Sequence, residues 1–144
     1  MVVNWNRKEL LRACLESDEV AEALLPEVME SGAVAGLVGE NVFNHLWESR
    51  KRNEKLNLAE SETALSPQEK RLAYDALFWP GVPPNLEQAR GYLRALKLRR
   101  LQRLRDNLLR DIEAAVQAQD SARLAELQRA KSNLDKELRQ MARA

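Results

Sequence analysis

The sequence has little of the chemistry that metal sites and covalent catalysis need. It contains one cysteine, Cys14, and one histidine, His45, in 144 residues. A single cysteine excludes an internal disulfide and a cluster of thiolate ligands, and a lone histidine leaves no HExxH pattern. We expect Cys14 to be a small core residue and His45 to lie at the surface or at a core edge. No metal or cofactor is predicted.

Motifs of phosphate binding and acid–base catalysis are also missing. The glycines of SGAVAGLVGE are not followed by the lysine of a P-loop, and they do not follow a strand. Adjacent acids such as Asp18 and Glu19 are typical of the first turn of a helix, where they interact favourably with the helix dipole. The sequence therefore predicts a chain that is not an enzyme.

Long apolar runs are absent too. No run approaches the ~20 residues that a membrane-spanning helix needs. The opening residues MVVNWNRKELL carry charges where a signal peptide would have its apolar segment. We therefore expect no membrane partner, and a bacterial cytoplasm as the compartment.

Charge is present in quantity but is unevenly distributed. Residues 1–80 contain 9 Lys/Arg and 14 Asp/Glu, a net charge of −5, whereas residues 81–144 contain 14 and 8, a net charge of +6. An acidic first part is thus joined to a basic second part. With 31% charged residues and 5% aromatic residues, the composition favours a helical protein with much exposed helix surface.

Several short helices are predicted in the first part of the chain. Helix caps are expected at Asn6, paired with Glu9, at Ser17, and at Ser66, paired with Glu69. The apolar stripes expected to face a core are Leu10, Leu11, Cys14 and Leu15; Val20, Ala23, Leu24 and Val28; Val42, Phe43, Leu46 and Trp47; and Leu72, Ala73, Ala76 and Leu77.

Breaks between these helices are predicted from proline, glycine and polar stretches. Pro26 is expected to kink or end the second helix, because it removes a backbone hydrogen bond. Gly32, Gly36 and Gly39 mark a connection, and the weakly periodic residues 53–65 are expected to form a loop or a short helix. The prolines of WPGVPPN end the last short helix.

A long helix and a helical return are predicted for the second part. Asn85 is expected to cap a helix of about 34 residues, which at ~1.5 Å per residue spans roughly 50 Å. Gln119-Asp120-Ser121 interrupts the leucine pattern, and Asp120 is expected to cap a second helix that folds back antiparallel. The predicted fold is all-α, with a bundle of short helices at 1–84 and a long helix with a C-terminal hairpin at 85–144.

The facing positions of this hairpin can be paired from the leucine spacing. Lys131 interrupts the returning stripe opposite Leu108, so looser packing is expected there. Because burial of the leucines and the entropy cost of ordering the chain are of similar size, the hairpin alone is expected to be marginally stable. The expected pairs are Val116 with Leu124, Ile112 with Leu127, Leu104 with Leu134, and Leu101 with Leu138.

Three stretches, in this order, share a pattern with one known family: RKELLRACLESDEVAEALLPEV, VFNHLWESRKRN and LEQARGYLRALKLRRLQRLRDNLLRDIEAAVQAQDSARLAEL. The first has a charged residue, a leucine pair and an acidic start to the next helix. The second has an aromatic and apolar helix face before a polar loop, and the third has a linking helix and a hairpin. Nearly the whole chain resembles the C-terminal helicase-binding domain of bacterial DnaG-type primases.

The resemblance implies a binding module rather than a catalyst. In that family the domain docks on the N-terminal collar of the hexameric replicative DNA helicase, where the hairpin supplies much of the affinity and the bundle modulates helicase activity. It implies a cytoplasmic protein at the replication fork, with primer synthesis carried by separate domains. We expect this chain to be a monomer by itself.

The residues expected to contact the helicase are chosen by their position near the far end of the hairpin, since the family has no sharp residue motif to transfer. The interior stripe is used by packing within the hairpin, so the partner must meet the remaining surface. The chosen residues are Leu109, Ile112, Glu113, Val116, Gln117, Arg123, Leu124 and Leu127.

Three other functions stay open from the sequence. The chain could be the N-terminal domain of the replicative helicase itself, whose fold is similar to that of the primase domain. It could be a nucleic-acid-binding helical module, with phosphate contacts from Arg99, Arg100 and Arg103 within a basic run that spans residues 94–105. It could also be a coiled-coil adaptor that dimerises through the hairpin.

Overall fold

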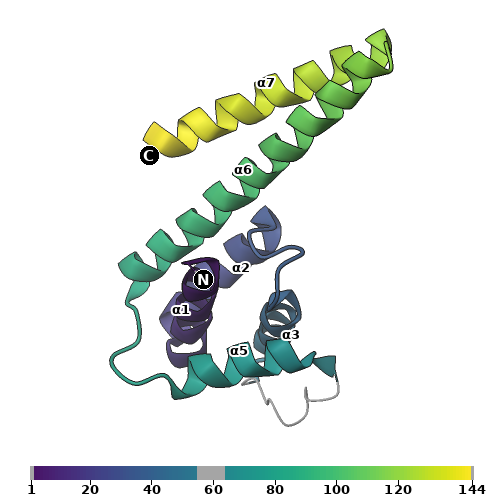
Figure 1. Cartoon of the computed structure of the whole chain (residues 1–144). Helices are drawn as coiled ribbons and strands as arrows, with labels where there is room; N and C mark the ends of the chain where they lie inside the picture. The colour runs from purple at the N-terminus through teal and green to yellow at the C-terminus, as the bar shows by residue number, and fades with distance from the viewer. Residues whose placement is uncertain (1, 55–63, 144) are drawn as a thin grey trace. The chain divides into compact units, whose positions relative to one another are not determined.

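The computed structural model describes residues 2–54 and 64–143, and over these residues the fold is all-α (Figure 1). No strand is formed within these ranges. The predicted fold class is therefore confirmed. The helices are α1 (Val2–Glu16), α2 (Asp18–Ser31), α3 (Glu40–Lys51), α5 (Pro67–Phe78), α6 (Leu86–Gln117) and α7 (Ser121–Arg143).

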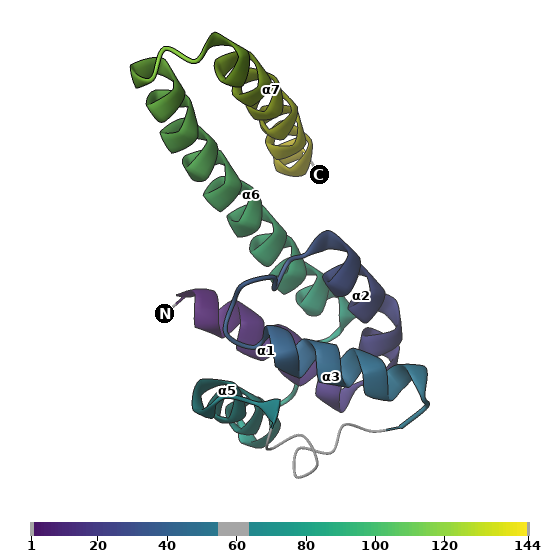
Figure 2. The same cartoon turned by 90° about the vertical axis from the view of Figure 1, so that its right-hand side faces the viewer.

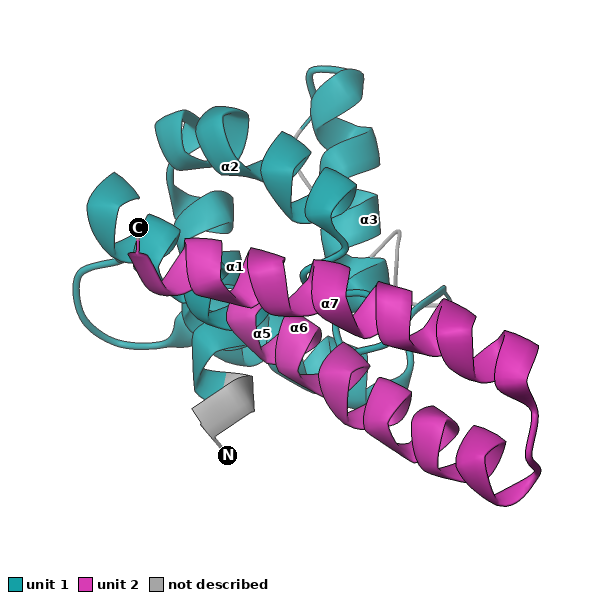
Figure 3. Ribbon diagram, turned by 90° about the horizontal axis from the view of Figure 1, so that it is seen from above, with its two compact units in different colours: residues 1–97 teal, residues 98–144 magenta. Residues whose placement is uncertain are grey.

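The chain forms two compact units, residues 1–97 and 98–144 (Figure 3). The division lies inside α6 and not at 84/85, where the sequence suggested it. The reason is that the first three turns of α6 belong to the core of the first unit. Ala89, Leu93 and Leu96 are buried there together with residues of α1, α2 and α3.

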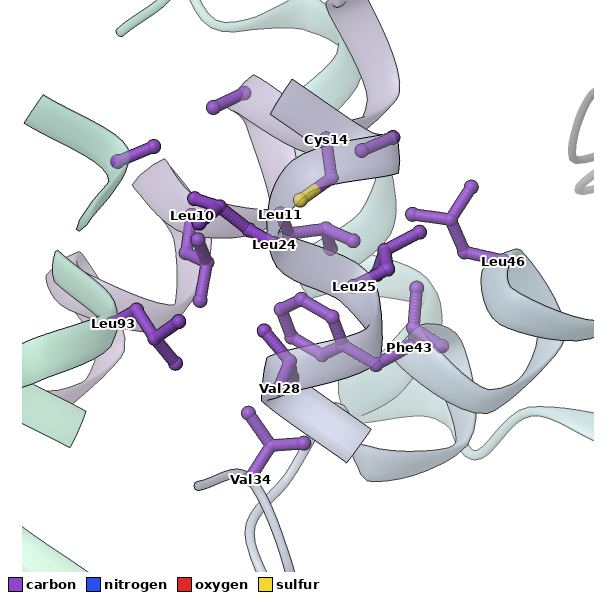
Figure 4. Packing of buried hydrophobic residues seen from close by; sticks show 14 of the residues in the cluster. Leu10, Leu11, Cys14, Leu24, Leu25, Val28, Val34, Phe43, Leu46 and Leu93 are labelled. Carbon is purple, nitrogen blue, oxygen red and sulfur yellow. The ribbon is translucent and has the colours of Figure 1, made fainter. Parts of the chain in front are cut away.

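The core of the first unit is built from four short helices and the start of α6. Helix α1 contacts α2 and α5, and α3 contacts the same two helices (Figures 1 and 2). Figure 4 shows Phe43 of α3 among leucine and valine side chains from α1, α2 and α6. Cys14 lies in this cluster, fully buried, as predicted.

Most of the predicted helix starts are confirmed. The Ser17 hydroxyl accepts a hydrogen bond from the backbone N–H of Val20 at the start of α2. At the start of α5, Ser66 and Glu69 form the expected capping box, with Pro67 in the first turn. Caps of the same kind open the last two helices, with Asn85 accepting from the backbone of Gln88 at 2.8 Å and Asp120 accepting from that of Arg123 at 3.1 Å.

The cap predicted at Asn6 is wrong, because α1 already begins at Val2. The predicted cap depends only on neighbouring residues, whereas the first turns of α1 are held by contacts with residues that are distant in the sequence. The Trp5 ring packs edge-to-face on Trp79, and Arg7 donates a hydrogen bond to the carbonyl of Val38 at 2.8 Å.

The expected helix end at Pro26 is also wrong. Helix α2 continues through Pro26 to Ser31 and ends at Gly32, whose φ of 67° is left-handed. Proline inside a helix costs ~3 kcal/mol, but Leu24, Leu25 and Val28 are fully buried and each contributes about 1.5–3 kcal/mol. Burial of the helix face therefore outweighs the lost hydrogen bond.

Of the residues predicted in the stripes of the short helices, one is exposed, four are half-buried and the others are buried. The half-buried ones are Leu15, Trp47, Leu72 and Leu77. In α2, Ala23 is exposed, and Ala21 and Leu25 are buried beside Val20, Leu24 and Val28. The helix thus presents pairs of adjacent residues to the core, a wider face than the predicted stripe. The loop or short helix predicted at 53–65 falls mostly on residues outside those that the structure describes.

In the second unit, α7 returns antiparallel alongside the last turns of α6 (Figures 1 and 3). The connection includes Gln119, which has a φ of 57°. Arg105 of α6 and Asp135 of α7 form an ion pair at 3.2 Å, one residue along from the expected pair of Leu104 with Leu134. The buried residues of this unit are Leu101, Ala115, Leu127 and Leu134.

Two residues expected inside the hairpin are exposed, Leu104 at 38% and Val116 at 55%. At 3.6 residues per turn, Leu101, Leu108 and Ile112 lie close to one line along the helix. Leu104 lies about 60° to one side of this line, and Val116 lies about 60° to the other side. A row of residues spaced by three or four positions gradually turns around the helix, because neither spacing equals 3.6. The pairing predicted from the leucine spacing did not include this rotation. Ala115, not Val116, is the buried residue of that turn.

Candidate protein-interaction surface

An open groove lies between the two helices of the hairpin. We call it the hairpin groove, and its volume is about 610 Å³. Leu109 and Ile112 form its α6 wall, and the α7 residues that form the other wall are polar. The groove is located where Lys131 replaces an apolar residue in the returning stripe, as the sequence suggested. Its lining residues are Leu109, Ile112, Gln128, Lys131, Ser132, Asp135 and Arg139.

The polar wall of the hairpin groove is organised by Asp135. This carboxylate accepts a hydrogen bond from Lys131 at 2.9 Å and pairs with Arg105 across the hairpin. The hydrogen bond from Lys131, followed by the positive charges of Lys131 and Arg105, lowers the pKa of Asp135. Asp135 is therefore ionised at neutral pH and holds both cations beside the groove.

An apolar strip runs along α6 at the edge of this groove, and two of its three residues also line the groove. We call Leu109, Ile112 and Val116 the outer strip. They lie at i, i+3 and i+7, which places them on one side of the helix. Leu109 is 41% exposed and Val116 55% exposed, while Ile112 is half-buried. Solvent-exposed apolar residues in such a row are typical of a surface that another protein covers.

The other predicted contact residues are distributed around the far end of the hairpin. Glu113, Gln117 and Arg123 are exposed, and Leu124 is half-buried. Arg123 lies 3.7 Å from Glu126 in an exposed ion pair. Leu127 is buried in the hairpin interior, where a partner cannot reach its side chain without separating the helices.

A second exposed apolar surface lies on the first unit and was not predicted from the sequence. We call it the aromatic patch: Trp5, Tyr74, Phe78 and Trp79, four of the chain's seven aromatic residues, all more than 40% exposed. The Trp5 and Trp79 rings meet edge-to-face with centroids 6.1 Å apart, and Tyr74 stacks on Phe78.

Charged side chains of α1 hold the surroundings of the aromatic patch in place. The Lys8 ammonium lies 3.1 Å from the centroid of Trp79 and 4.4 Å from that of Trp5. Arg12, which is buried and pairs with Glu9 at 3.4 Å, donates to the carbonyl of Gly81. These contacts fix the chain segment that follows α5 against α1.

The sequence carries one signal for this patch. Tyr74 and Phe78 lie at i and i+4 on α5, away from the stripe that contains Ala73 and Ala76. Trp5 is far from them in the sequence, so the pairing of α1 with α5 is needed to bring it to the same surface. The patch is therefore visible in the structure and only partly in the sequence.

The described residues contain neither an activated thiol nor a cluster of metal ligands. Burial raises the pKa of the Cys14 thiol to about 12, so the thiolate nucleophile is not formed at neutral pH. Over residues 2–54 and 64–143, no three His, Cys, Asp or Glu side chains come together in a group that could hold a metal ion. None of the helices in the described part of the chain has both the length and the apolar character to cross a bilayer.

Comparison of the chain with protein families, with curated proteins and with solved structures finds no match.

Proposed function

We propose that this chain is a protein-interaction domain that docks on the hexameric replicative DNA helicase, as the C-terminal domain of a bacterial primase does. The observation that carries the proposal is the outer strip, Leu109, Ile112 and Val116, exposed beside the hairpin groove. The strip and the groove offer an apolar row and an adjoining hollow, which suits a partner helix.

The exposed part of the outer strip contributes binding free energy when a partner covers it. A fully buried Leu, Ile or Val contributes about 1.5–3 kcal/mol, so covering the exposed half of each side chain contributes on the order of 1 kcal/mol. Leu101, Leu127 and Leu134 are already buried. A partner therefore gains from the outer strip without breaking the packing inside the hairpin.

The charged residues around the groove would orient the partner more than they would raise the affinity for it. Lys131 and Arg139 line the hairpin groove, and residues 98–144 contain 11 Lys/Arg and 7 Asp/Glu, a net charge of +4. A positive surface of this kind speeds association with an acidic partner surface and fixes its orientation. The identity of the partner comes from the resemblance, in which the order of bundle, long helix and hairpin matches the primase domain.

The proposal predicts that Val116→Asp weakens binding to the helicase hexamer at least tenfold. A carboxylate at a 55% exposed position leaves the fold intact but has to be desolvated when the outer strip is covered. Binding is measured by isothermal titration calorimetry with the helicase of the same organism, and helicity by circular dichroism.

The matched control is Val82→Asp. Val82 is 89% exposed on the first unit, so the same change of side chain is made away from the hairpin. We expect this variant to bind the helicase as the unchanged chain does. Equal affinities for the Val116→Asp and Val82→Asp variants would show that the outer strip does not contact the helicase.

A further inference from the structure

Between Gln88 and Arg105 the long helix carries six arginines and one lysine but no acidic residue. The whole stretch lies within α6. Helices exposed to solvent usually place an acid three or four residues from each base, as α7 does with Lys131 and Asp135. No acid lies inside this stretch; only Arg90 and Arg103 have an acid of the same helix three residues away, Glu87 and Asp106, and Arg103 and Asp106, both among the described residues, form no ion pair. Like charges such as Arg99 and Arg103 lie one turn apart instead.

The fold neutralises part of this run from outside the helix. Lys97 pairs with Glu27 of α2, and Arg105 pairs with Asp135 of α7. Among the residues that the structure describes, Arg99, Arg100 and Arg103 have no ion-pair partner. Arg99 and Arg103 are exposed, and Arg100 is half-buried. Three arginines within two turns of one helix are therefore left with their charge open to an anion.

Guanidinium groups bind both phosphate and carboxylate oxygens in a bidentate way, so the spacing of the arginines has to decide between these anions. Arginine offers a planar, always charged fork that binds two oxygens at once. Arg99 and Arg103 are four residues apart, about 6 Å along the helix axis, which matches roughly two phosphates of a strand at ~3.4 Å each. Residues 98–144 contain no aromatic residue, so bases cannot stack there and sequence cannot be read in that way.

We infer that Arg99, Arg100 and Arg103 form a binding site for the phosphate backbone of a nucleic acid. Contact is with phosphates alone, so duplex and single strand bind without base preference. With three phosphates neutralised, the affinity for duplex falls about 40-fold between 50 and 200 mM salt. The site goes beyond helicase docking, since these three arginines lie outside the outer strip and the hairpin groove.

The test measures the fluorescence anisotropy of a labelled 20-base-pair duplex and a labelled 20-nucleotide oligo-dT, titrated with the full chain. A triple variant, Arg99→Gln with Arg100→Gln and Arg103→Gln, is compared with a control triple variant, Arg110→Gln with Arg129→Gln and Arg143→Gln. Both variants lose three positive charges, and the control residues are exposed residues of the same unit.

At 50 mM salt we expect the first variant to bind both probes at least tenfold more weakly, with a salt slope smaller by about 0.9 per arginine on duplex. The control variant should lose less than threefold. Helicase affinity, measured in parallel, should change little for the first variant. The inference is overturned if the two variants bind nucleic acid equally, if the unchanged chain binds neither probe at 50 mM salt, or if the first variant loses helicase affinity while its nucleic-acid affinity is unchanged.

Discussion

At the scale of single residues, Glu69 connects the starts of two helices with one buried carboxylate. Its oxygens accept hydrogen bonds from the backbone N–H and side-chain amide of Asn41 in α3, both at 3.2 Å, and from the backbone N–H of Ser66 at 3.1 Å. Burial raises the pKa of Glu69, but the hydrogen bonds from Ser66 and Asn41 together outweigh it and lower the pKa below its usual 4.5. The ionised form is therefore favoured by folding.

We predict that Glu69→Gln lowers the free energy of unfolding at pH 7 by roughly 1–3 kcal/mol, because a charged acceptor for the partly buried donors of Asn41 and Ser66 is lost. A lowered pKa gives stability that is fully present above the unfolded pKa near 4.5 and is lost as pH falls through the folded value. The difference between variant and unchanged chain should therefore shrink below pH 4.5. Urea unfolding at several pH values measures it, with the exposed Glu22→Gln as the control, and a pH-independent difference would contradict it.

At the scale of the elements, two glycines have equally open surroundings but different backbone conformations. They show separately what the backbone conformation contributes to stability. A Cβ added at Gly91 or at Gly36 would meet no atom within 4 Å. Gly91 lies inside α6, whereas Gly36 lies between α2 and α3 with a φ of 73°. Their substitutions should therefore differ in sign although both sites are open.

We predict that Gly91→Ala stabilises the chain by about 0.5–1 kcal/mol, because alanine loses less backbone entropy when the helix forms. Gly36→Ala should destabilise it by about 1 kcal/mol or more, because a side chain disfavours the left-handed backbone. Urea unfolding at pH 7 compares the two variants. A stabilising Gly36→Ala, or a destabilising Gly91→Ala, would be inconsistent with these backbone conformations.

The elements also show which features could be predicted from the sequence. Caps at Ser17, Ser66, Asn85 and Asp120 are short-range hydrogen bonds, and the residues that form them are adjacent in the chain. The helix through Pro26 could not be predicted, because its stability comes from burial against distant residues. Leu104 and Val116 were misplaced by a small angular drift that accumulates along α6.

The candidate surfaces also divide into one that the sequence indicated and one that depends on contacts between distant residues. Looser packing at Lys131 was visible as a missing leucine, and the hairpin groove lies there. The aromatic patch combines Trp5 of α1 with Trp79 after α5, and no local pattern joins these positions. Surfaces formed on one helix can thus be predicted, whereas those formed between helices need the fold.

At the scale of the whole molecule, the functions that the sequence leaves open predict different oligomeric states for the chain. A domain that docks on a helicase as a single copy is a monomer by itself. An adaptor that pairs through its hairpin, or a helicase collar that closes into a ring, self-associates.

We predict that sedimentation velocity gives a molar mass close to 16.5 kDa from micromolar concentrations to about tenfold higher. Pairing of two copies through the hairpin would bring together two units that each carry a net charge of +4, and this like-charge repulsion opposes self-association. A mass that doubles with concentration would favour the hairpin adaptor, and a ring without helicase present would favour the helicase collar.

The uneven placement of aromatic residues gives the two units different optical signatures. All three tryptophans, Trp5, Trp47 and Trp79, lie in residues 1–97, and residues 98–144 hold neither tryptophan nor tyrosine. Ultraviolet emission from the chain thus arises in one unit alone, while the amide signal arises in both. Melting curves recorded with the two signals separate the loss of the hairpin from the loss of the bundle without any added label.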